Sequence, residues 1–108
     1  MWLVRDGDVL ATVEVCAGVR ARTKGLLGRR EIDGALLLRP CRSVHTIGMR
    51  VAIDVAFCDA TGSVLRTCTL RPWRLSPVVP RAAFVVEAAD GAFERWNLAP
   101  GDRLELRG

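Results

Sequence analysis

The segment SVHTIGMRVAIDVAF, residues 43–57, decides the fold of this chain. From Val51 to Phe57 every second residue is a large apolar one, which is the period of a β-strand. The residues between them are alanine or Asp54, so both faces of this strand are expected to be covered. The segment therefore predicts the central strand of a mostly β domain, with the only histidine of the chain, His45, just before it.

Turn signals connect further strands to this one. Asp6-Gly7 lies between two apolar runs and is a strong hairpin signal, and Asp59–Gly62 is a second turn directly after the segment. Glycine and proline bound the remaining apolar runs. The other predicted strands cover residues 2–5, 9–16, 35–38, 64–70, 83–88 and 103–107.

Two short helices are expected between the strands. Apolar residues three to four apart predict an amphipathic helix over residues 19–30, although two interior glycines weaken it. Asp90 is expected to cap a second helix that runs through Trp96 and buries Phe93 and Trp96. Prolines predict an irregular segment over residues 71–81, a candidate binding loop that Trp73 is expected to anchor to the body.

Length and composition predict one domain over residues 1–108. The chain is 50% hydrophobic and 26% charged, as folded proteins are. The fold class that follows is mostly β (α+β), a compact barrel-like or sandwich-like antiparallel sheet with one or two short helices. No run of 18 to 20 apolar residues and no export signal is visible in the sequence, so a cytoplasmic protein without a membrane span is expected.

The cysteines and the phosphate-binding motifs of a sequence indicate whether a metal or a cofactor is expected. Four cysteines without a CxxC pair are expected to be reduced core residues, and Cys41 with His45 lacks the second pair of ligands that a zinc site needs. No P-loop or dinucleotide fingerprint is present. We therefore expect neither a metal nor a cofactor.

Arginine accounts for most of the net charge of +4. A candidate electrostatic patch for phosphates or an acidic partner consists of Arg20, Arg22, Lys24, Arg29 and Arg30, although a solvated helix face is the simpler interpretation. No aromatic residue is interleaved with this cluster, so nucleic acid is an unfavoured partner.

Asp54 and His45 are the residues that stand out chemically. A carboxylate in an apolar strand must accept hydrogen bonds or pair with a cation, so a structural role is favoured for Asp54. If Asp54 oriented His45 beside a nucleophile such as Ser43, Ser76 or Cys41, the set would form a hydrolytic triad. Glu87, at the end of another apolar run, is expected to be structural as often as functional.

Four ordered blocks of sequence resemble one prokaryotic family. They are VHTIGMR with IDVAFCD (residues 44–59), RTKGLLGR (22–29), VVEAADG (85–91) and LAPGDRL (98–104). Together they are similar to the family called domain of unknown function 192. The resemblance implies a β-rich domain with no established activity, so it assigns no catalytic residue. Ala52 departs from the family pattern, which often has proline there, and Ala89-Asp90-Gly91 stands after Glu87-Ala88 where the pattern has Ala-Gly.

The leading hypothesis is a noncatalytic binding or accessory module with a cleft near His45 and Asp54, flanked by the proline-rich loop. The partner is expected to be a small molecule or a protein. A small hydrolase that uses His45 and Asp54 is the alternative from another class, and nucleic-acid or acidic-partner binding through residues 20–30 is the third. The candidate ligand-binding residues are His45, Thr46, Met49, Arg50, Asp54 and Trp73.

Overall fold

The computed structural model describes residues 1–17 and 34–108. The predicted helix over 19–30 and the basic cluster of residues 20–30 therefore lie outside the described residues. The strands are β1 (Trp2–Arg5), β2 (Asp8–Ala17), β3 (Ala35–Arg39), β4 (Ile53–Cys58), β5 (Val64–Leu70), β6 (Phe84–Ala89) and β7 (Glu105–Arg107), and α2 (Ala92–Arg95) is a single helical turn.

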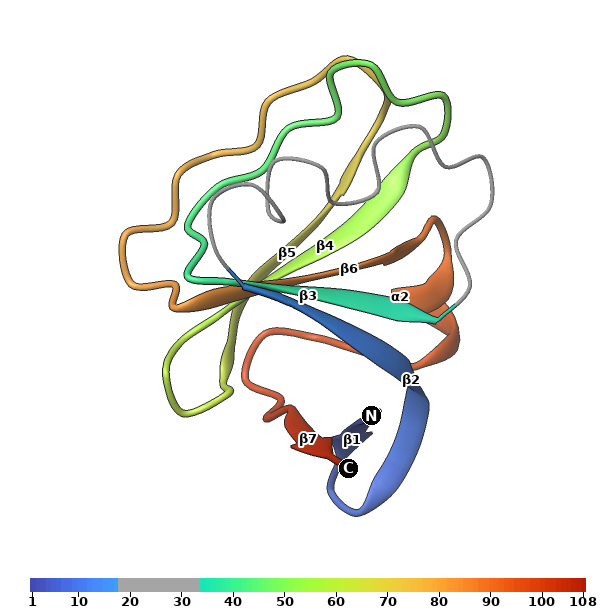
Figure 1. The fold of residues 1–108 in the computed structure, drawn as a ribbon, viewed down its shortest axis with the longest axis vertical. Coiled ribbons are helices and arrows are strands. Elements are labelled where there is room, and N and C mark those ends of the chain that lie inside the picture. The colour runs from blue at the N-terminus through green and yellow to red at the C-terminus, as the bar shows by residue number, and fades with distance from the viewer. Residues whose placement is uncertain (18–33) are drawn as a thin grey trace.

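The strands form one twisted sheet in the order β5-β4-β6-β3-β2-β1-β7, with β5 and β7 at its two edges (Figure 1). The mostly β fold class is thus confirmed, as an open sheet that is not closed into a barrel. Two details differ from the prediction. The sheet is not wholly antiparallel, because β2 and β3 pair in parallel, and the middle position belongs to β3, while β4 lies one strand in from an edge.

Both predicted hairpins are present. β1 pairs with β2 and β4 pairs with β5, each antiparallel. In the second turn one carboxylate oxygen of Asp59 accepts hydrogen bonds from Thr61 N and Ser63 N, at 2.9 and 3.0 Å. The hydrogen bond from the Thr61 hydroxyl is the main reason that the pKa of Asp59 lies below its usual value, and the two backbone hydrogen bonds lower this pKa further.

Each face of the sheet carries its own apolar core. On the first face, the buried Phe93 of α2 packs with Ala56 and Val86. On the second face, Met49 from the β3–β4 connection packs with Leu36 and Val55. Every residue of β4 is buried, as the alternation of large and small residues predicted.

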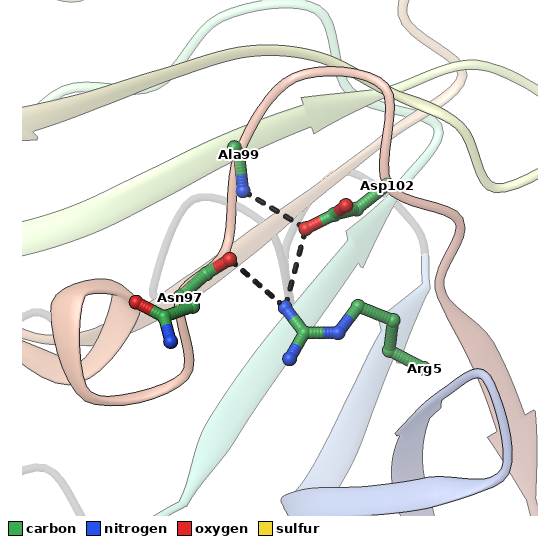
Figure 2. A network of polar contacts seen from close by, with 4 residues as sticks. All are labelled: Arg5, Asn97, Ala99 and Asp102. Atoms are coloured by element: carbon green, nitrogen blue, oxygen red, sulfur yellow. Dashed lines mark hydrogen bonds and ion pairs between the residues drawn. The ribbon is translucent and has the colours of Figure 1, made fainter.

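A polar network joins the two ends of the chain (Figure 2). The Arg5 guanidinium of β1 donates to the carbonyl of Asn97 at 3.1 Å and pairs with Asp102 at 3.2 Å, and the same Asp102 oxygen accepts from Ala99 N at 3.0 Å. Since β7 also pairs with β1, this network fixes the turn that leads into the last strand.

Candidate functional site

Asp54 caps the short helix α2 from a neighbouring strand. One of its oxygens accepts hydrogen bonds from Gly91 N at 3.0 Å and Phe93 N at 3.1 Å, and the other accepts the Thr69 hydroxyl at 2.7 Å. Gly91 is the N-cap residue, at φ 90°, and no side chain of its own caps the helix. The prediction that Asp90 caps α2 is therefore wrong, because the buried carboxylate of Asp54 already occupies the two amides.

His45 lies away from Asp54. Its Nδ1 accepts a hydrogen bond from Ile47 N at 3.2 Å, its backbone pairs with Leu75, and the side chain is exposed. None of the hydrogen bonds formed by either side chain joins the two. Asp54 points to the α2 face of the sheet, whereas the loop that carries His45 packs through Met49 on the other face.

A hydrolytic triad is not assembled in the described part of the chain. The Ser76 hydroxyl accepts from Val44 N and donates to the Pro77 carbonyl, at 2.9 and 2.8 Å, and the buried Cys41 thiol donates to Ser43 O. Burial raises the pKa of Cys58 to about 12 and also raises that of Cys68. These thiols lack the ready ionisation that a nucleophile needs.

The loops between β3 and β4 and between β5 and β6 run side by side (Figure 1). Backbone hydrogen bonds of 2.8 to 2.9 Å join them from Val79 N to Arg42 O, from Ser76 N to Val44 O and from Thr46 N to Arg74 O. We call residues 42–50 and 71–79 the double loop. The long irregular segment predicted from its prolines is thus one half of a hydrogen-bonded pair.

Thr46 holds the double loop together. Its side chain is fully buried, and the hydroxyl donates to Arg71 O at 2.5 Å and accepts from Arg74 N at 2.9 Å. The Thr46 carbonyl also accepts from Trp73 N at 2.9 Å. Thr46 and the buried Met49 therefore support the double loop from within.

Thr46→Val is expected to loosen the 71–76 segment while the sheet stays folded. Valine has the same shape but no hydroxyl, so Arg74 N loses its acceptor, at a cost of about 1–3 kcal/mol. Amide hydrogen exchange should become faster at residues 71–76 and remain unchanged in β3 and β6. Equal exchange rates in the variant and the parent chain would contradict this role.

Apolar side chains gather on the outside of the double loop. The exposed fractions are 72% for Leu75, 66% for Val78, 63% for Trp73 and 44% for Ile47. The expectation that Trp73 anchors the loop to the body is therefore wrong. Trp73 also has a positive φ of 62°, a backbone conformation that is uncommon for a bulky residue.

The predicted site residues thus divide into three groups. Asp54 lies under α2, Thr46 and Met49 are buried within the double loop, and the other three predicted residues, His45, Arg50 and Trp73, are exposed on it. The exposed Leu75 and Val78 were missed, because the loop has no apolar period to indicate which of its residues face solvent.

Glu87 is the second buried carboxylate. Its exposed fraction is 4%, and its register neighbours on either side are Leu36 and Val55. Among the described residues it has no hydrogen-bonding or ionic partner. Burial raises its pKa from 4.5 to about 7. No group of three or more potential metal ligands occurs in the described ranges.

Solved structures share this fold. A crystal structure from Sinorhizobium meliloti 1021 superposes with a TM-score of 0.79 at 24% identity, over 96% of this chain and 89% of that one. A protein of unknown function from Novosphingobium aromaticivorans gives a TM-score of 0.76 at 18% identity, over 87% of this chain and 74% of that one.

Proteins of two Pyrococcus species are similar to this chain in sequence. A UPF0127 protein of Pyrococcus furiosus is 40% identical over 63 residues, which are 58% of this chain and about half (54%) of that protein's length. A UPF0127 protein of Pyrococcus abyssi is 28% identical over 98 residues, 86% of this chain and 84% of the relative. The profile of DUF192, described as "Uncharacterized ACR", matches residues 2–106. The chain therefore belongs to the DUF192 family, as the ordered blocks of its sequence predicted.

Proposed function

We propose that this domain is a noncatalytic protein-binding module whose contact surface is the double loop. The observation that carries the proposal is the exposure of Trp73, Leu75 and Val78, each more than 60% accessible, on one pair of loops. A group of large apolar side chains exposed on a protein surface often marks an interaction site. Tryptophan in particular is enriched among the residues that dominate binding energy.

The charge of the double loop indicates the kind of partner. Its two segments contain no Asp or Glu. They carry four exposed arginines: Arg42, Arg50, Arg71 and Arg74. Arginine binds carboxylates through two parallel hydrogen bonds, which lysine does not. The proposed partner is therefore a protein segment that combines acidic and apolar side chains.

Hydrogen bonding prepares this surface for binding. The four cross-loop backbone bonds, with the one from Trp73 N to the Thr46 carbonyl among them, and the buried hydroxyl of Thr46 fix the positions of the exposed residues. A surface that is already ordered loses less conformational entropy on association. The left-handed backbone at Trp73 is unfavourable for a bulky residue, and strain of this kind concentrates at functional positions.

The observed contacts favour binding over catalysis. His45 belongs to the same exposed surface, but within the described part of the chain its imidazole bonds only to the backbone of Ile47, and the Asp54 carboxylate already accepts hydrogen bonds from two amides at the start of α2. We therefore assign His45 a contact role. Cytoplasmic location is part of this proposal, and it is supported by the lack of any disulfide among the four cysteines, all of which are described. Across the described ranges, no helix is long and apolar enough to cross a bilayer.

Selection from a displayed library of random dodecapeptides tests the proposal. The full chain is the bait, and Trp73→Gly is the counter-selection bait. Glycine adopts a positive φ without strain, so this variant is expected to fold at least as stably as the parent chain while losing the indole. Enriched peptides should combine acidic and apolar residues. Their affinity should fall about 30-fold or more with Trp73→Gly, the effect of a hot spot of about 2 kcal/mol.

Trp2→Ala is the matched control, because Trp2 is also an exposed tryptophan (47%) but lies on β1. It should leave peptide affinity unchanged. The sole imidazole gives an NMR signal that needs no assignment, and it should shift on peptide binding. Three results would overturn the proposal: no enrichment, a basic consensus, or Trp73-dependent binding to phosphatidylserine vesicles or single-stranded DNA in place of peptides.

A further inference from the structure

The strand β5 has an edge that is unpaired within residues 1–17 and 34–108. Among these described residues β5 pairs only with β4, and it ends the sheet on that side. Near its start, Val64 exchanges backbone hydrogen bonds with the 101–102 turn. From Arg66 to Leu70 no backbone bond to a further segment is present among the described residues. An open edge of this length is a template for another extended chain.

A pocket lies beside that edge, on the α2 face. It has a volume of about 170 Å³, and its walls come from the middle of β5 and from the start of α2. It is lined by Asp54, Thr67, Cys68, Thr69, Asp90, Gly91, Phe93 and Glu94. Small-molecule sites usually measure about 300–1,000 Å³. The pocket is therefore too small for a cofactor, but it can take one side chain.

The pocket is negatively charged at its mouth. Asp90 and Glu94 are both exposed, and neither carboxylate has an ion-pair or hydrogen-bond partner in the described ranges. Asp54 at the base is already occupied by its three hydrogen bonds. The Thr69 hydroxyl bonds to Asp54, so Thr69 faces α2, and Thr67 shares that face because strand residues alternate.

We propose that the β5 edge binds an extended segment of a protein partner by strand addition, with one arginine or lysine side chain of that segment in the pocket. Main-chain hydrogen bonds to Arg66–Leu70 would supply affinity, and the pocket would supply specificity. In an added strand, alternate side chains face α2, which brings one of them to the pocket mouth. Asp90 and Glu94 would then bind its charged end.

This surface is separate from the double loop. Asp54 and Thr69 mark the α2 face, whereas the double loop packs on the opposite face through Met49. The double loop is rich in arginine and the pocket in carboxylates, so the two surfaces suit segments of opposite charge. The failure of either proposal leaves the other intact.

Four synthetic peptides, two of which differ only in the position of N-methyl groups, test strand addition. The first is acetyl-Val-Thr-Arg-Thr-Val-amide. The second replaces arginine with citrulline, which has the same shape without the charge. The third design carries N-methyl groups on every second backbone nitrogen and is made in two versions, which methylate the two alternate sets of nitrogens. One version removes the N–H groups that donate to β5, and the other removes the N–H groups that point away from it. At millimolar peptide, the first should produce saturable NMR shifts at residues 65–70 and 90–94 and slow the amide exchange of β5.

The size of the effects separates the two contributions. Citrulline should weaken binding about tenfold or more through loss of the charge. One N-methylated preparation should lose binding, and the other should retain it. In the protein, Asp90→Asn combined with Glu94→Gln should lower the affinity for the arginine peptide by a similar factor. Glu105→Gln, which removes an exposed carboxylate on β7, should leave that affinity unchanged.

Several results would overturn the proposal. They are the absence of saturable shifts, equal binding of the arginine and citrulline peptides, and full binding of both N-methylated preparations. A concentration-dependent dimer that protects β5 in the absence of peptide would assign the edge to a second copy of this chain instead. Peptide shifts confined to residues 42–50 and 71–79 would place binding at the double loop.

Discussion

Asp54→Ala is expected to destabilise the folded domain by about 3 kcal/mol. The substitution leaves the amides of Gly91 and Phe93 and the hydroxyl of Thr69 without their acceptor. Each buried donor left unsatisfied costs about 1–3 kcal/mol, and Thr69 recovers part of its loss because it can reach water. Asp54→Asn keeps one carbonyl acceptor and is expected to lose about half as much. Urea denaturation of the full chain measures both effects.

Asp90→Ala is the matched control for this experiment. Asp90 directly precedes Gly91, so the sequence favours it as the cap, but its carboxylate is exposed and has no hydrogen bond in the described structure. Its removal should change the free energy of unfolding by less than about 0.5 kcal/mol. If Asp90→Ala cost as much as Asp54→Ala, the local cap would be the real one and the cross-strand cap would be wrong.

Glu87→Gln is expected to stabilise the domain above neutral pH by about 3 kcal/mol. The folded-state pKa of about 7 lies above the ordinary value of 4.5, so the folded domain binds a proton that the unfolded chain has released. At 1.36 kcal/mol per pH unit, the difference corresponds to about 3 kcal/mol of stability. This contribution is fully present below pH 4.5 and is lost as the pH rises through 7. Glutamine is neutral at every pH, so the variant does not lose this stability as the pH rises.

The measurement compares urea midpoints of the parent chain and Glu87→Gln between pH 4.5 and 8.5. The curves should meet at the acidic end and separate with rising pH. Glu14 and Cys68 are the other titratable groups in the row of the sheet that contains Glu87. Glu105→Gln, on an exposed position of β7, should follow the parent chain at every pH. Parallel curves for the parent and Glu87→Gln would show that Glu87 is ionised in the folded domain.

The strands could be predicted from the sequence because their signals are local. Alternation of apolar residues located β4 to within two residues, and Asp6-Gly7 located the first hairpin. Pairing across the sheet has no local signal. The parallel contact between β2 and β3 and the central place of β3 depend on how the chain crosses the sheet, which periodicity does not describe.

The site was predicted in part. Period 2 already places Asp54 on the face opposite to Ile53 and Val55, but the sequence does not tell which face the His45 loop covers. This loop covers the second face of the sheet, whereas Asp54 points to the first. His45 and Asp54 are therefore separated, and the Asp54 carboxylate accepts its hydrogen bonds from α2. Proline content predicted the 71–81 segment as a candidate binding loop, yet composition does not indicate which of its side chains face solvent, and Trp73 is exposed.

The pairing of the first and last strands has a practical consequence. Trp2 and Arg107 are register partners, and both chain ends lie at the opposite end of the molecule from the double loop (Figure 1). A short linker can therefore join them, and a circular permutant with new ends in the Asp59–Gly62 turn should keep the same sheet. A fluorophore or surface tether at either original end leaves the double loop accessible.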